Sequence, residues 1–218
     1  HARNYLIAAK EALPMLDIRY LTMGDGCAFL PVSMVSKKIE EKVACNEYVQ
    51  GISSLISKES KPGDVVFIGQ ALRGKSHDAR ATSAYFDHIQ AFAQILKDKS
   101  IPIIIFDGTF PPGPDPAMCV KELWRPFPNK FNCEKTVEEA YTSYRQFDKL
   151  AIATSNLSEN IYYAPLRLGL CVKGICGQYT KQGTPIWHDF GHITEESSRE
   201  LGNLLRQHLS QSSIISNK

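Results

Sequence analysis

Short apolar runs that alternate with helical patterns most constrain how this chain folds. Residues 65–68 and 102–106 are almost entirely β-branched or aromatic, which is typical of strands buried on both faces. Weaker strand patterns occupy residues 18–23 and 161–164. Apolar side chains recur at helical spacing in five segments, residues 2–13, 35–56, 82–96, 136–152 and 195–209. Buried strands separated by helices predict an α/β three-layer sandwich, with helices on both faces of a central parallel sheet.

The composition fits one globular domain and excludes several classes of partner. The chain has 218 residues, of which 43% are hydrophobic, and no repeat or linker interrupts residues 1–218. A net charge of +2 gives no reason to expect nucleic acid as a partner. The longest apolar run, residues 101–106, is too short for a transmembrane helix. The sequence contains no glycine-rich phosphate loop and no cluster of metal ligands, so we expect neither a cofactor nor a metal.

The six cysteines favour disulfides over a metal site. No Cys-x-x-Cys pair occurs and no histidine lies at zinc-ligand spacing from a cysteine. Five of the six lie in stretches rich in Gly, Pro or Asn, where a reduced core cysteine is not expected. The favoured pairing joins sequence neighbours, Cys27 with Cys45, Cys119 with Cys133 and Cys171 with Cys176. Such loop-tying disulfides need an oxidising compartment outside the cytoplasm. Six reduced core cysteines are the alternative.

The carboxyl ends of the predicted strands indicate where a site would lie. Ligands of open parallel sheets bind outside these ends, which here correspond to residues 24–27, 69–73 and 107–112. Asp107 either lines such a cleft or caps the next turn. The proline-rich stretch that follows is predicted to be a long ordered loop, and long loops at strand ends are often functional.

The segment before the last helix contains the most chemically informative spacing. Asp189 and His192 are three residues apart, and in a helix or a tight turn such side chains face the same side. A carboxylate there orients an imidazole and stabilises its protonated form, as a general base requires. Thr194 is predicted to cap the following helix, with Glu195 and Glu196 in its first turn. Taken alone, the pair fits a solvated surface turn better than a catalytic one.

The sequence PIWHDFGHITEESSRELGNLL resembles the last conserved block of SGNH hydrolases. Within them it most resembles the SGNH domains attached to membrane acyltransferases of family three. Leu170-Cys171, followed by Cys176, matches a pattern found before that block. The opening His1-Ala2-Arg3-Asn4 resembles the residues that follow Gly-Asp-Ser in the family's first block. The resemblance covers the whole architecture and is specific at the two ends and in the cysteine pattern.

The resemblance implies a Ser-His-Asp mechanism in which His192 is the base and Asp189 orients it. The nucleophilic serine is expected immediately before His1, so residues 1–218 are expected to form a single SGNH-like domain without its first strand and Gly-Asp-Ser block. Two alternatives remain: an internal nucleophile at Ser76, in Gly-Lys-Ser-His, or a domain without a nucleophile.

The same resemblance suggests donors for the oxyanion hole. Gly26 follows the second strand, although a turn beside Cys27 explains it equally well. The family has Asn after the third strand, and Gln70 occupies that place here. A side-chain amide there is able to donate to a developing oxyanion.

The implied function is the transfer of an acyl group, acetyl above all, to or from hydroxyls of a cell-surface or secreted glycan. The partners are then a glycan acceptor and an acyl donor, with a membrane acyltransferase domain at the N-terminal side of the parent chain. The implied location is extracytoplasmic and tethered to a membrane. The alternatives are a catalytically inactive SGNH-fold module that binds glycan or docks to a partner, and a secreted α/β domain of unrelated function.

Overall fold

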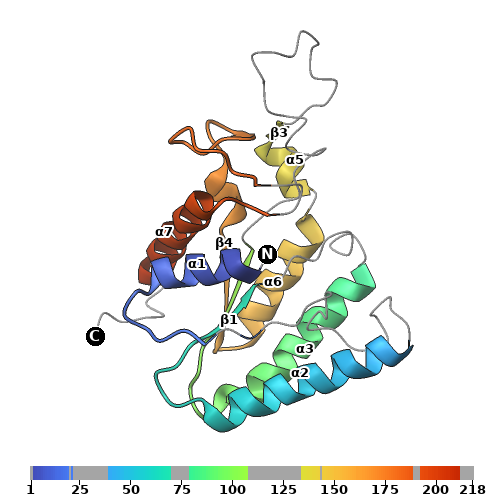
Figure 1. Ribbon diagram of the computed structural model, residues 1–218. Helices are drawn as coiled ribbons and strands as arrows, with labels where there is room; N and C mark the ends of the chain where they lie inside the picture. The colour runs from blue at the N-terminus through green and yellow to red at the C-terminus, as the bar shows by residue number, and fades with distance from the viewer. Residues whose placement is uncertain are drawn as a thin grey trace. The chain divides into compact units, whose positions relative to one another are not determined.

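The structure, a computed structural model, describes seven stretches of the chain, residues 2–19, 21, 39–69, 79–107, 134–142, 144–188 and 192–211 (Figure 1). The chain is divided into two compact units. The first unit contains His1–Ile18, Asp107–Ser143 and Ala164–Lys218. The second unit contains Arg19–Phe106 and Tyr144–Tyr163. A single domain lacking its first strand stays a prediction.

The sheet has three strands in the order β1-β2-β4. They are β1 (Val66–Gly69), β2 (Ile103–Asp107) and β4 (Ile161–Pro165). Parallel pairing sets Val66 opposite Ile103 and Gly69 opposite Phe106. The isoleucines of β2 are fully buried, as expected for a strand covered on both faces. The α/β class and the parallel sheet predicted from the sequence are confirmed. Of the predicted strand at residues 18–23, residues 18, 19 and 21 are described and are not in a strand, and the other three lie outside the described residues.

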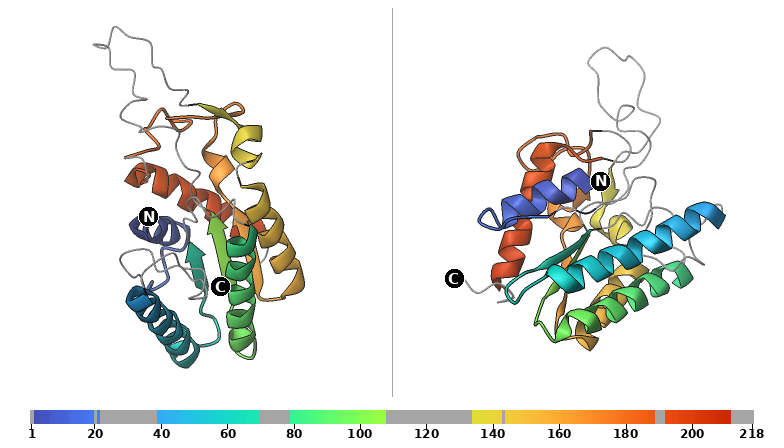
Figure 2. Two further views of the ribbon diagram at one scale, coloured as in Figure 1. Left: turned by 90° about the vertical axis from the view of Figure 1, so that its right-hand side faces the viewer. Right: turned by 60° about the horizontal axis from the view of Figure 1, so that its bottom comes forward.

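Three helices accompany this sheet in the second unit: α2 (Ile39–Glu59), α3 (Ala79–Lys97) and α6 (Arg145–Leu157). Figures 1 and 2 show α2 beside α3. The predicted apolar stripe of α3 is buried, and it packs with α6 and the strands into one core that includes Tyr85, Ile89, Phe92, Leu96, Phe147 and Ile161. Apolar side chains at i, i+4 and i+7 lie on one helix face, which is why the sequence predicts this element well.

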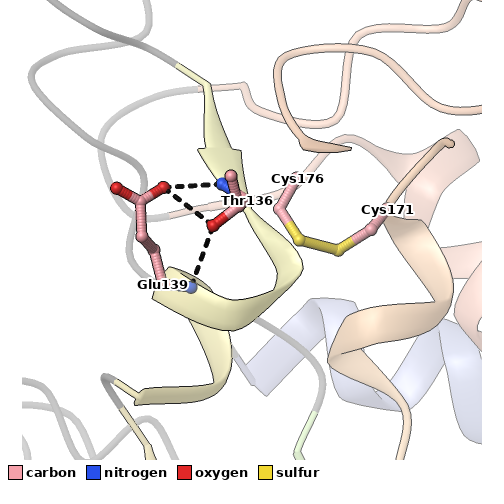
Figure 3. Close-up of a disulfide and its surroundings, with 4 residues drawn as sticks. All are labelled: Thr136, Glu139, Cys171 and Cys176. Atoms are coloured by element: carbon pink, nitrogen blue, oxygen red, sulfur yellow. Dashed lines mark hydrogen bonds between the residues drawn. A yellow bond between two sulfur atoms is a disulfide. The ribbon is translucent and has the colours of Figure 1, made fainter. Parts of the chain in front are cut away.

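The predicted helix over residues 136–152 is wrong, because the structure breaks it in two. A short strand, β3 (Lys135–Thr136), leads into α5 (Val137–Thr142), and α6 begins at Arg145. A capping box starts α5: the Thr136 hydroxyl accepts the N–H of Glu139 at 3.1 Å, and the Glu139 carboxylate accepts the N–H of Thr136 at 2.7 Å (Figure 3). The carboxylate of Glu139 also accepts the Thr136 hydroxyl at 3.1 Å, and the hydrogen bonds from the N–H and the hydroxyl of Thr136 lower the pKa of Glu139.

The predicted disulfide between Cys171 and Cys176 is present, with the two Cα atoms 4.2 Å apart (Figure 3). It closes a two-residue hairpin in which Lys173 and Gly174 have φ of 52° and 81°. Such a turn needs positive φ at both positions, and glycine supplies one at no steric cost. Cys27, Cys119, Cys133 and the side chain of Cys45 lie outside the described residues, so their pairing stays a prediction.

The first unit is built on a helix pair from the two ends of the chain. Helix α1 (Ala2–Ala12) packs against α7 (Glu195–Gln211), as both views of Figure 2 show. A methyl group at Gly202 would lie 2.6 Å from the carbonyl oxygen of Ala8, so glycine permits this close approach. Arg206 Nε also donates to the carbonyl oxygen of Ala12 at 3.1 Å. Helix α1 is therefore held firmly against α7.

None of the helices within the described ranges combines the length and the apolar character that crossing a membrane requires. In the same residues, no group of three or more His, Cys, Asp or Glu side chains is placed to hold a metal ion.

A buried carboxyl group on α6 makes the second unit sensitive to pH. Asp148 accepts a hydrogen bond from the Tyr163 hydroxyl at 2.6 Å, and both residues are buried. Burial raises the pKa of Asp148, and the Tyr163 hydrogen bond partly opposes this. A raised pKa in the folded state means that this group's contribution to stability is present below its ordinary pKa. The contribution is lost as the pH rises through the raised value.

We expect Tyr163→Phe to lower the free energy of unfolding by about 1–3 kcal/mol at pH 7, because a buried carboxylate loses a donor. The loss is expected to be smaller near pH 4, since a hydrogen bond to a neutral carboxyl is worth less. Urea unfolding at the two pH values measures both. Tyr162→Phe, on the same strand, is the control and is expected to change stability by less than about 0.5 kcal/mol. Equal losses at both pH values would contradict this coupling.

Candidate active site

His192 projects from a short loop whose two ends are fixed to each other. The backbone N–H of His188 donates to the carbonyl oxygen of His192 at 2.8 Å, and Trp187 pairs with Ile193 in an antiparallel bridge. Trp187 and Ile193 are buried, whereas His188 and His192 are exposed. The buried pair thus anchors the loop and leaves the imidazole of His192 accessible. Asp189 lies outside the described residues.

The residues after His192 are fixed to the last helix. Thr194 caps α7 as the sequence predicts, since its hydroxyl oxygen accepts the N–H of Ser197 at 3.2 Å. The same hydroxyl lies 2.8 Å from the carbonyl oxygen of Pro185, and the N–H of Thr194 donates to Ile186 at 2.9 Å. Glu195 and Glu196 occupy the first turn, where the helix dipole favours negative charge. His192 therefore leads directly into a rigid helix start.

The first turn of α1 lies against this same segment. The side-chain amide nitrogen of Asn4 is 2.8 Å from the carbonyl oxygen of Ile193 and 2.8 Å from the hydroxyl of Ser198. Arg3 and Glu195 form an exposed ion pair at 3.5 Å. All of these residues belong to the first unit. The first turn of α1 lies beside the loop that carries His192, although Asn4 and His192 are 188 positions apart in the sequence.

Asp107, at the carboxyl end of β2, caps a turn that is distant in the sequence, whereas the next turn along the chain lies outside the described residues. Its carboxylate accepts the backbone N–H groups of Leu166 at 2.6 Å and Arg167 at 3.3 Å, at the start of the 3-10 helix η3 (Arg167–Leu170). It also pairs with the guanidinium of Arg167. Burial lowers the pKa of Arg167 to about 10, so the side chain is still charged at neutral pH.

Sequence reasoning missed Arg167, because no local pattern links it to a carboxylate 60 residues earlier. The pair is deeply buried, with Asp107 6% and Arg167 1% exposed. It joins the end of β2 to the segment that continues through η3 to the Cys171–Cys176 hairpin. Its role here is to hold the backbone at the carboxyl ends of the strands.

The structure describes only some of the residues predicted for the site. His192 and Asp107 are described, whereas Asp189, Gly26, Gln70 and Ser76 lie outside the described residues. Strand β1 ends at Gly69, the last described residue before Gln70. The donors of the oxyanion hole and the orienting carboxylate therefore stay predictions.

Comparison with known proteins identifies the family. Residues 1–207 match a family model described as an SGNH domain fused to AT3 domains. The chain belongs to this family. No curated protein matches the chain.

The fold of this SGNH domain is shared with a solved structure, the periplasmic domain of a lipopolysaccharide acetyltransferase from Salmonella ser. Paratyphi A. The alignment covers 97% of this chain and 79% of the Salmonella chain, with a TM-score of 0.62 and 16% sequence identity. The sequence resemblance to SGNH domains attached to membrane acyltransferases is thereby confirmed.

Proposed function

We propose that this SGNH domain moves an acyl group, acetyl in the simplest case, to or from hydroxyls of a cell-surface or secreted glycan. The mechanism would use serine, His192 and Asp189. The observation that carries the proposal is the contact between the first turn of α1 and the segment after His192. A serine immediately before His1, as the family's first block implies, would precede α1. It would then lie near His192, whose side chain is exposed and whose backbone is held by hydrogen bonds.

In the proposed reaction the serine oxygen attacks the acyl carbonyl carbon while His192 takes the serine proton. The tetrahedral intermediate collapses, the bond to the leaving oxygen breaks, and His192 returns the proton to that oxygen. The resulting acyl-serine is attacked by water or by a sugar hydroxyl, with His192 again taking and returning the proton. Water as the acceptor gives an esterase and a sugar hydroxyl gives a transferase.

The start of α1 suits the negative oxygen that develops during attack. Backbone N–H groups and the positive end of the helix dipole stabilise such charge, and the first turn of α1 holds no acidic residue. Gly26 and Gln70 are the further donors that we propose. Asp189 would orient His192 and stabilise its protonated form.

The family's association with AT3 domains supports a membrane acyltransferase domain that supplies the acyl group. The Cys171–Cys176 disulfide supports an oxidising compartment outside the cytoplasm. We therefore propose that the domain receives an acyl group at the membrane and transfers it to or from the glycan outside the cytoplasm.

Turnover by the intact protein tests the proposal. The purified protein is expected to release p-nitrophenol from p-nitrophenyl acetate. It is also expected to release acetate from an acetylated glycan. Partition of labelled acetyl between water and added glycan distinguishes esterase from transferase. A protein that binds glycan but turns over no acyl ester would contradict the proposal and favour the inactive binding module.

A further inference from the structure

Asn4 is the side chain that connects the two parts of the proposed catalytic centre. Its amide nitrogen carries two hydrogens, and the structure gives each an acceptor: the carbonyl oxygen of Ile193 and the hydroxyl of Ser198, both at 2.8 Å. The carbonyl oxygen only accepts, so this contact fixes which end of the amide faces Ile193.

The acceptors belong to one connected group of hydrogen bonds. The hydroxyl of Ser198 lies 2.8 Å from the carbonyl oxygen of Thr194, to which it donates, and the N–H of Ser198 donates to the same carbonyl at 3.0 Å. Ser198 is fully buried. Asn4 thus binds directly to Ile193 and, through Ser198, to Thr194, the two residues that follow His192.

We infer that Asn4 is a positioning residue that sets the distance between the proposed nucleophile and the imidazole of His192. This inference rests on the proposed function. The residue expected before His1 is four positions ahead of Asn4 in the sequence, and Asn4 itself lies in the first turn of α1. On the other side, one peptide unit separates the bound carbonyl of Ile193 from His192. No substrate contact is assigned to Asn4.

The chemistry explains why an amide is suited to this position. Aspartate has the same shape but no hydrogen to donate, so it would set a negative oxygen against the carbonyl of Ile193. Alanine would leave both acceptors unoccupied. Displacement of a reacting group by 1 Å is able to cost about 10²-fold in rate, so a small loosening here is expected to be visible in kcat.

The test uses the intact protein with p-nitrophenyl acetate and counts active sites by fluorophosphonate titration. We expect Asn4→Ala and Asn4→Asp to lower kcat per active site by about 10- to 100-fold, with KM within about twofold. Asn4→Gln retains the donor on a longer side chain and is expected to recover part of kcat. Arg3→Ala, which removes an exposed ion pair on the neighbouring residue, is the control and is expected to leave kcat unchanged.

A second measurement does not depend on activity. The N–H of Thr194, bonded to Ile186 at 2.9 Å, is expected to exchange with deuterium about two- to tenfold faster in Asn4→Ala. Unchanged kcat per active site, or a rise in KM alone, would overturn the positioning role. If the wild-type protein turns over no acyl ester, the proposed function fails. The exchange rate then tests by itself whether Asn4 holds the segment after His192 in place. Faster exchange supports this role of Asn4, and unchanged exchange overturns it.

Discussion

Asp107→Ala lowers the free energy of unfolding by about 3–5 kcal/mol, the expected result of removing one partner from a buried ion pair. The guanidinium of Arg167 loses its counter-charge in a site where it is 1% exposed. The N–H groups of Leu166 and Arg167 lose their acceptor in the same substitution. Folded domains are stable by only about 5–15 kcal/mol, so this is a large fraction of the total.

The measurement is urea unfolding monitored by circular dichroism, and the m value is expected to be the same in the variant and in the wild type. Asp107→Asn retains one acceptor for the backbone and is expected to fall between wild type and Asp107→Ala, which keeps the prediction testable if the alanine variant does not fold. Asp64→Ala is the matched control: Asp64 also accepts a backbone N–H, from Lys61 at 2.7 Å, but it is exposed. It is expected to lose about 1 kcal/mol or less. Similar losses at Asp107 and Asp64 would contradict the importance of the buried pair.

The second large effect is on catalysis. His192→Ala is expected to lower kcat for an acetyl ester by about 10²–10⁴-fold, because the proposed general base is lost. Stability is expected to change by less than about 0.5 kcal/mol, since the imidazole is exposed. Added imidazole is expected to restore part of the rate, as a free base is able to enter the space left by an exposed side chain.

His188→Ala is the control for this substitution. His188 lies at the other end of the same loop and is also exposed, but only its backbone N–H takes part in the loop hydrogen bond. The kcat of the His188→Ala variant is expected to remain within about twofold of the wild-type value. A loss at His188 as large as that at His192 would show that the loop, rather than the His192 imidazole, matters for turnover.

Local patterns predicted the elements whose apolar spacing is regular. The stripe on α3 and the apolar run of β2 are visible in the sequence because burial on one face or on both faces leaves a periodic or a continuous signal. The same reasoning predicted the Thr194 cap, since a cap involves neighbours within one turn.

The break between α5 and α6 shows where this reasoning fails. Ala140, Phe147 and Ala151 are all buried and keep helical spacing across the break, so periodicity alone continues the helix. The capping box of Thr136 and Glu139 marks the start of α5, and the N-cap residue of α6, Tyr144, makes no side-chain capping hydrogen bond that would mark the second start.

Contacts between distant parts of the chain left no local signal. Asp107 and Arg167 are 60 residues apart, and Asn4 and Ile193 are 189 apart. A single sequence gives residue types but not which distant side chains meet, so the pairing of Asp107 with Arg167 and the role of Asn4 emerge only from the structure. Asp189 and His192, by contrast, are only three positions apart, so the sequence alone is enough to connect them.

Covalent labelling tests the central claim most directly. The intact protein is treated with a fluorophosphonate, which forms a bond from phosphorus to an activated serine oxygen as fluoride leaves, and the labelled peptide is sequenced by mass spectrometry. We predict one label, on a serine immediately before His1, and no label in His192→Ala. A label on Ser76, or an unmodified wild-type protein, would contradict the proposed mechanism.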